Sequence, residues 1–252
     1  MPPRLNVLVY YIEASTNCQG KIIGNHMAST LHPSGIATSS AKDPDVYHHG
    51  NLRPALIAAA REALDTVAPE SISLKALATQ LGVSQPAPYR HFSSREALLT
   101  AVATDGFELF TAALAEAAAK GLEWERFERA CLAYLRFGSR YPGLYRLMFA
   151  SHLLKTATDP SLGSASKTAF DQLLHLLEKL IAPEVINVTA IWVWSTLHGL
   201  VMLEAEGLTS ATLTQKITPA GVVQRMIGTL SGAPRSPKGQ EKSTHRKAAT
   251  RK

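Results

Sequence analysis

Side chains that can read double-stranded DNA occur close together in this sequence. Gln85 can form two hydrogen bonds with an adenine in the major groove, and Ala87 can contact a thymine methyl group. Lys75 and Ser73 stand at the start of a preceding predicted helix, where exposed N–H groups favour phosphate. We expect these four residues to belong to a DNA-binding site, although Lys75 can equally be a solvated surface side chain.

The elements that must position these side chains form a helix-turn-helix over residues 73–92. Ser73 is typical of an N-cap and begins a helix that continues to Leu81, and Gly82 suits the left-handed residue after it. Ser84 is expected to cap a second helix that ends near Phe92. In such a motif the second helix enters the major groove with its N-terminal residues at the base edges.

Two prolines interrupt this second helix. Pro86 falls in the first turn, where N–H groups have no partner within the helix, so it costs little there. Pro88 gives up a hydrogen bond and crowds the Ser84 carbonyl. We therefore expect a stiff and irregular start to the helix, but not a broken one, with base readout left to Ser84, Gln85 and Ala87.

Apolar spacings of three and four residues surround the motif. They predict a helix from about residue 49 that Pro69 ends, and a long helix opened by the capping box Ser93-x-x-Glu96 and closed before Gly121. Further helices are expected at 122–140, 142–154, 165–182, 184–206 and 217–230. Since no run alternates with the period of a strand, the predicted fold is all-α with about nine helices.

Residues 50–110 resemble the DNA-binding domain of the TetR/AcrR family of transcriptional regulators. The resemblance depends on motifs in a fixed order and spacing: Ala59-Ala60, Ala63-Leu64, Ser73-x-x-x-Leu77-Ala78, Leu81-Gly82-Val83-Ser84, Tyr89-Arg90-His91-Phe92 and Arg95-Glu96-Ala97-Leu98-Leu99. It implies a ligand-responsive repressor that binds a palindromic operator as a homodimer, in the cytoplasm and associated with the nucleoid.

The resemblance also implies phosphate contacts for Ser84, Tyr89, His91 and Arg95. Each has an alternative: Tyr89 can be a core residue, His91 a plain surface residue, and Arg95 the partner of an acidic neighbour. Phe92 is expected in the core.

Residues 122–230 resemble the regulatory domain of the same family more loosely. Trp194-x-x-x-His198-Gly199 is similar to the W-x-x-x-H-G signature of one subgroup, as is the segment 141–149. The resemblance implies a dimer interface built from the helices at 184–206 and 217–230.

These C-terminal helices carry more bulky apolar side chains than one dimer seam needs, which favours a pocket for a small, apolar effector. The candidate lining residues are Tyr134, Phe137, Met148, Trp194, His198 and Met202. The alternative for each is an ordinary role in the core or the interface.

Composition and charge divide the chain into four parts. We expect a disordered leader over 1–45, with Met27 as an alternative start, a DNA-binding domain over 46–110 and a regulatory domain over 111–232. Residues 233–252 hold seven Lys and Arg against one Glu, so the entire net charge of +6 lies in this predicted disordered, basic tail. The tail is either an electrostatic arm for DNA or a solubility segment.

Other classes of protein fit the sequence less well. Residues 185–203 lack Asp, Glu, Lys and Arg, but their scattered polar residues favour a buried helix over a membrane span. His175-x-x-Glu178 occurs once and in the wrong order for a carboxylate metal site, and no catalytic motif is present. We expect no enzyme, metal or cofactor. The alternative function is a helical adaptor whose tail binds DNA without specificity.

Overall fold

The computed structural model describes residues 52–150, 159–208 and 218–232. Over these ranges the regular elements are eight α-helices and three short 3-10 helices, with no strand, so the predicted all-α fold is confirmed. The predicted disordered leader and basic tail lie outside the described residues.

The chain divides into two compact units. Unit 1 takes in residues up to Ala112 together with Arg140–Gln172, and unit 2 takes in Ala113–Ser139 and the chain from Leu173 on. The sequence did not indicate that residues 140–172 would group with the N-terminal part. The boundary between a DNA-binding and a regulatory domain at 110 stays a prediction.

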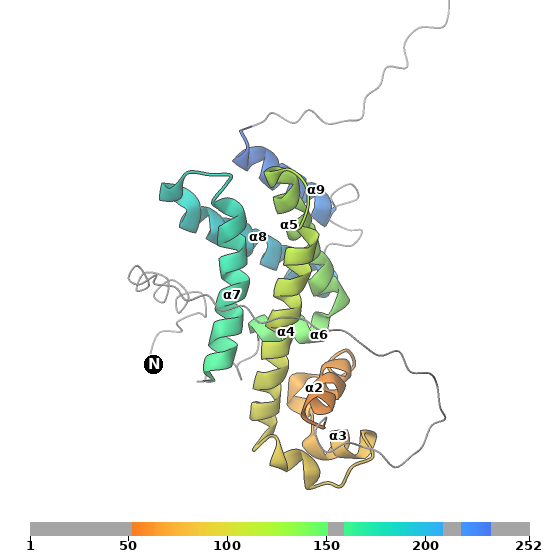
Figure 1. The fold of residues 1–252 in the computed structure, drawn as a ribbon. Coiled ribbons are helices and arrows are strands. Elements are labelled where there is room, and N and C mark those ends of the chain that lie inside the picture. Colours follow the sequence, from red (N-terminus) through yellow and green to blue (C-terminus); the bar gives the residue numbers. More distant parts are fainter. Residues whose placement is uncertain (1–51, 151–158, 209–217, 233–252) are drawn as a thin grey trace, which may run out of the picture. The chain divides into compact units, whose positions relative to one another are not determined.

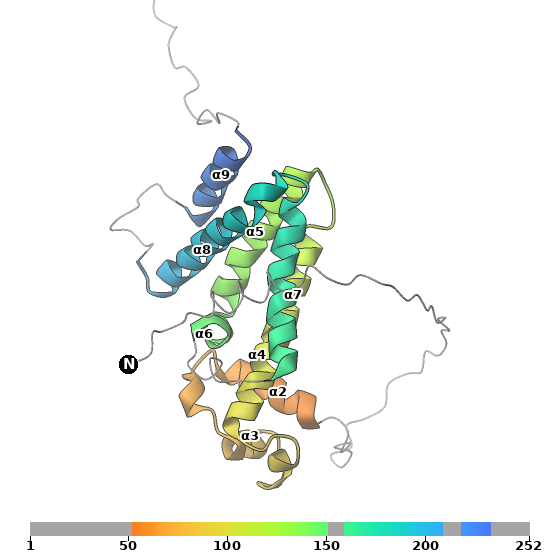
Figure 2. The ribbon, with the colours of Figure 1, turned by 90° about the vertical axis from the view of Figure 1, so that its left-hand side faces the viewer.

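Unit 1 is built around the first part of the long helix α4 (Arg95–Ala117). Helices α2 (Leu52–Ala63) and α3 (Leu74–Gln80) lie beside it in both views (Figures 1 and 2). The 3-10 helices η1 (Pro69–Ser71) and η2 (Ala87–Arg90) precede and follow α3. Buried apolar side chains of these elements and of the segment after η2 contribute to their core: Leu56, Leu74, Leu77, Phe92, Leu98 and Leu99.

Helix α6 (Pro142–Ala150) completes unit 1 because two glycines allow close contact. A Cβ atom on Gly106 of α4 would lie 2.8 Å from the Met148 sulfur, and one on Gly143 would lie 1.9 Å from the Leu64 carbonyl oxygen. The Phe149 ring meets the Phe107 ring edge-on, with centroids 5.2 Å apart. These contacts explain why α6 belongs with the N-terminal helices.

Unit 2 contains most of α5 (Glu123–Arg140), the end of α7 (Pro160–Leu177), η4 (Pro183–Val185), α8 (Ile186–Ala205) and α9 (Pro219–Leu230). A Cβ atom on Gly138 of α5 would lie 2.3 Å from a Val201 methyl carbon of α8, so these helices touch at a glycine. Close by, the Ser139 hydroxyl donates to the Glu204 carboxylate at 2.8 Å. Helix α9 contacts α8.

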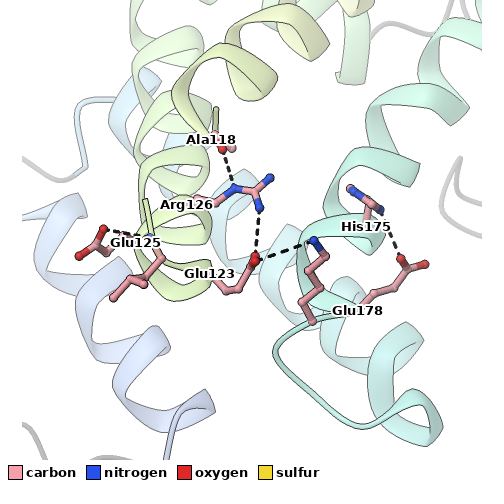
Figure 3. A network of polar contacts seen from close by, with 8 residues as sticks. Ala118, Glu123, Glu125, Arg126, His175 and Glu178 are labelled. Carbon is pink, nitrogen blue, oxygen red and sulfur yellow. Dashed lines mark hydrogen bonds and ion pairs between the residues drawn. The ribbon is translucent and has the colours of Figure 1, made fainter. Parts of the chain in front are cut away.

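A polar network holds the C-terminal end of α4 within unit 2 (Figure 3). Arg126 of α5 donates from Nε to the Ala118 carbonyl at 2.7 Å, and Arg129 donates to the Ala117 carbonyl at 2.9 Å. Glu123 accepts from Arg126 at 3.2 Å and lies 3.8 Å from the Lys179 ammonium. The last carbonyls of α4, which lack partners within the helix, are therefore satisfied by arginines of the next helix.

Two helix starts differ from the sequence expectation. The N-cap of α4 is Ser94 and not Ser93, because the Ser94 hydroxyl accepts from the Ala97 N–H at 3.1 Å. Helix α7 begins at Pro160 and not near 165, since proline is well tolerated at the first helical position and Asp159 accepts from the Ser161 N–H at 2.8 Å. The expected helix end at 154 lies outside the described residues.

Within the described ranges, two helices are long and apolar enough to cross a membrane by length and composition, Arg95–Ala117 and Pro183–Ala205. Half of the apolar window is buried in the first, as in the core helix of a globular protein, but only 28% is buried in the second. The sequence predicts that α8 is buried at a subunit interface; within this chain most of its apolar window is not buried, and cover by a second copy stays a prediction.

The contact at Gly143 generates a prediction about stability. Gly143→Ala should lower the free energy of unfolding by about 3 kcal/mol, because the new methyl group meets a backbone carbonyl that cannot move cheaply. Gly163→Ala in α7 is the matched control, since its Cβ meets nothing within 4 Å, and it should leave stability unchanged or slightly raised. Urea unfolding followed by circular dichroism measures both, and equal effects would contradict the close contact.

Candidate nucleic-acid interface

The helix-turn-helix begins as the sequence indicates. The Ser73 side chain caps α3 by accepting from the Ala76 N–H at 3.5 Å. At the other end Gly82 has φ +68°, the Gly82 N–H donates to the Thr79 carbonyl, and the Val83 N–H donates to the Ala78 carbonyl. This is the Schellman arrangement, which reverses the chain directly after a seven-residue helix.

The second helix of the motif is not an α-helix, which corrects the expectation. Residues Ala87–Arg90 form a 3-10 helix whose N-cap is Pro86, with no side-chain capping bond, so Ser84 does not cap it. The Tyr89 N–H donates to the Pro86 carbonyl and the His91 N–H to the Pro88 carbonyl, both to the third residue before. The prolines explain the change, because they remove donors and because an α-helical Pro88 would collide with the Ser84 carbonyl.

Most of the predicted reading residues lie on the surface of this turn. Ser84 and Gln85 are exposed, and Ala87 and His91 are half-buried. Tyr89 is 55% exposed, so it is not a core residue. Phe92 is 3% exposed, which confirms it in the core. Lys75 is exposed on α3, and its contact with phosphate stays a prediction.

Arg95 has partners inside the protein, as one of the two sequence interpretations proposed. Its guanidinium donates to the Glu70 carbonyl of η1 at 2.7 Å and to the Glu96 carboxylate at 3.0 Å. The pKa of Glu96 is held below its ordinary value by the hydrogen bond from its own backbone N–H, then by Ser94 and Arg95. Arg95 therefore ties the start of α4 to η1, and phosphate contact there competes with these bonds.

Arg90 is an exposed cation that the sequence analysis quoted in a motif but did not assign to the site. If the motif's second helix is α-helical, its first residues make the base contacts and Arg90 has no role. In a 3-10 helix, residues three apart share a face, so Arg90 lies on the same face as Ala87. The 3-10 geometry therefore adds Arg90 to the candidate interface.

The predicted effector residues fall in both units. Tyr134 and Phe137 are buried on α5, and Trp194, His198 and Met202 are half-buried on α8, all within unit 2. Met148 is buried against α4 in unit 1. Burial lowers the pKa of His198 below its ordinary value, so the imidazole is uncharged at neutral pH.

The other polar cluster that the sequence analysis weighed shows no metal-site geometry. His175 Nδ1 lies 3.3 Å from the Glu178 carboxylate, and both side chains are more than half exposed (Figure 3). Over the part of the chain that the structure describes, no three His, Cys, Asp or Glu residues are placed to hold a metal ion. Cys131 is buried, and burial raises the pKa of its thiol.

Comparisons with known proteins agree with this geometry. Residues 56–102 match the family model of bacterial regulatory proteins of the tetR family, and residues 127–230 match the model of the tetracyclin repressor-like C-terminal domain. Together the two models cover more than half of the chain.

Individual relatives are similar over most of the same range. The chain is 28% identical over 157 residues to an uncharacterised HTH-type transcriptional regulator of Mycobacterium tuberculosis, an alignment that covers 62% of this chain and 71% of that protein. A protein of unknown function from Rhodococcus has a TM-score of 0.64 and 29% identity, covering 75% of this chain and 97% of its own. The transcriptional regulator FadR of Bacillus subtilis, solved in complex with stearoyl-CoA, has a TM-score of 0.56 and 14% identity, covering 72% of this chain and 99% of its own.

Proposed function

Because the chain belongs to the TetR family of transcriptional regulators, we propose that it binds a near-palindromic operator as a homodimer and releases it when an apolar effector binds. Family membership gives the general function, which is that of a DNA-binding, repressor-type transcriptional regulator and not of an enzyme. Members of this family are cytoplasmic proteins, and association of this one with the nucleoid is part of the proposal. The W-x-x-x-H-G subgroup stays a prediction.

The observation that carries the proposal is the set of exposed side chains after the reversal at Gly82, namely Ser84, Gln85, Tyr89 and Arg90. Gln85 projects an amide from a segment in which Pro86 and Pro88 cannot donate backbone hydrogen bonds. Side chains therefore supply a larger share of the donors available at this turn. An amide at the start of the recognition segment suits adenine, which offers an acceptor and a donor in the major groove.

Gln85→Ala should lower the ratio of operator to random-DNA affinity by about 10- to 100-fold, since a bidentate base contact contributes about 1–3 kcal/mol of discrimination. A duplex enriched by the wild-type protein from a randomised library serves as the operator. Lys75→Ala is the matched control: it should weaken both duplexes alike and make the salt dependence shallower by about 0.9 per protomer. An unchanged affinity ratio in Gln85→Ala would show that Gln85 does not read a base.

Homodimer formation is supported by the uncovered face of α8. Val188 is 74% exposed, Trp192 42% and Leu203 46%, and their spacing places them along one line of the helix. Gly199 lies on the same line, and a Cβ there would meet nothing within 4 Å, so this chain does not use the space above it. Exposed apolar side chains at this spacing favour a protein interface, and a second copy of α8 fits it.

Trp192→Glu should weaken self-association by at least about 30-fold, because a charge at the centre of an apolar interface removes an aromatic anchor and must be desolvated. Leu122→Glu places the same charge on an apolar residue that is 75% exposed at the start of α5, and it should leave the dimer intact. Sedimentation velocity over a dilution series measures both. Equal sedimentation of the wild type and Trp192→Glu would locate the interface elsewhere.

An apolar effector site in unit 2 is supported by the aromatic side chains on two touching helices. Gly138 brings α5 against α8, and Tyr134 and Phe137 lie within one turn of this contact along α5. The uncharged His198 adds an imidazole without the cost of a buried charge. The FadR regulator shares only the fold with this chain, and its complex with stearoyl-CoA supports the choice of an apolar ligand class.

Titration of the protein–operator complex with long-chain acyl-CoA should quench Trp fluorescence and lower operator affinity together, because the two ligands must weaken each other reciprocally. His198→Ala should reduce both effects in parallel. Quenching without loss of operator affinity would indicate a pocket that is not coupled to DNA. Release that persists undiminished in His198→Ala would place the effector elsewhere.

The alternative function, a helical adaptor with DNA affinity from its basic tail, gives a different outcome in the library experiment. A tail without a reading surface binds every duplex according to charge and enriches none. An adaptor also has no need for an exposed Gln85 beside two prolines. Enrichment of one sequence therefore separates the two functions.

A further inference from the structure

The cations of the helix-turn-helix region differ in whether the protein already neutralises them. Residues 52–100 contain five Lys and Arg residues. Arg61 pairs with Asp105 at 2.6 Å, and Arg95 pairs with Glu96 and the Glu70 carbonyl. Among the residues that the structure describes, Arg53, Lys75 and Arg90 have no acidic partner, and all three are exposed. A polyanion that approaches this region therefore meets three charges that no carboxylate compensates.

Arg53 differs from the other two cations because an aromatic ring fixes its position. It is the second residue of α2, and its guanidinium carbon lies 4.9 Å from the centroid of the Phe92 ring. Phe92 is 3% exposed and comes two residues after the end of η2. Helix α2 is also in contact with η2. The stack thus holds a positive charge from the first helix directly beside the recognition turn.

Arg53 is exposed although it lies over the buried Phe92 ring, so the N–H groups of its guanidinium are available to a ligand. A guanidinium that lies over a ring uses its flat face, while its N–H groups point outward in the plane. That planar fork matches two oxygens of a phosphate, and an arginine held in one place loses less conformational entropy on binding. Pre-ordering of this kind is expected for a ligand contact, whereas a charge that serves only solubility does not need it.

We propose that Arg53 is a phosphate-binding residue of the DNA interface, held in position by the Phe92 ring. The proposal rests on the proposed operator-binding function and extends its interface to the first turn of α2. Arg53 contacts the DNA backbone and carries no sequence information, so it adds affinity and register to the base contacts of Gln85.

The test compares salt dependence and phosphate ethylation interference on the duplex enriched by the wild-type protein. Arg53→Met keeps an apolar cover on Phe92 and removes the charge. It should make the slope of log affinity against log salt shallower by about 0.9 per protomer and abolish interference at one phosphate of each half-site, with base preference unchanged. Arg136→Met removes an exposed arginine of α5, to which no DNA or dimer contact is assigned, and should change neither readout.

Arg53→Lys covers the case in which Arg53→Met melts at a lower temperature than the wild type. A lysine keeps the charge but cannot bind two phosphate oxygens in a plane, so it should retain the salt slope and weaken interference at the same phosphate. A wild-type slope and interference pattern in Arg53→Met, or an unchanged pattern in Arg53→Lys if Arg53→Met does not fold, would overturn the proposal while the operator function stands. Failure of the wild-type protein to enrich any duplex would instead remove the proposed function itself.

Discussion

Burial of a few apolar side chains holds the proposed DNA-reading surface in place. Helix α3 has seven residues and η2 has four, and helices this short are not stable in water alone. Leu77 of α3, Pro88 of η2 and Phe92, which follows η2, are buried, while Gln85 before η2 and Tyr89 within it are exposed. The position of the readers therefore depends on packing within unit 1, and the hydrogen bonds of the turn only refine it.

Pro86 and Pro88 determine the backbone geometry of this surface. They exclude α-helical geometry at this turn and remove two backbone donors, so fewer main-chain groups are left to contact a ligand there. The same prolines stiffen the turn in the unfolded as well as the folded state, which lowers the entropy lost on folding. A short, rigid turn with an exposed amide, an exposed phenol and an exposed guanidinium at Arg90 is the result.

Local signals could be predicted from the sequence, and long-range contacts could not. The cap at Ser73 and the reversal at Gly82 depend on neighbours within a few residues, and both are confirmed. The bond from Arg95 to the Glu70 carbonyl joins residues 25 positions apart, and sequence spacing contains no signal for it. The two prolines predict an irregular helix start, but only the hydrogen bonds of the folded chain show that the segment is a 3-10 turn and not a strained α-helix. The hydropathy of α8 predicts burial at a subunit interface, but it does not show which surface covers the helix, and this chain alone leaves one face uncovered.

Hydroxyl-radical footprinting of the full-length protein on its enriched duplex tests most directly whether this turn reads DNA as part of a symmetric dimer. We predict two protected patches, related by a dyad and about 10 base pairs apart, that persist at salt concentrations which remove random DNA. Loss of these patches in Gln85→Ala, with the protein still folded, would link them to the recognition turn. Uniform protection that fades with salt, or a single patch without a dyad, would contradict the account.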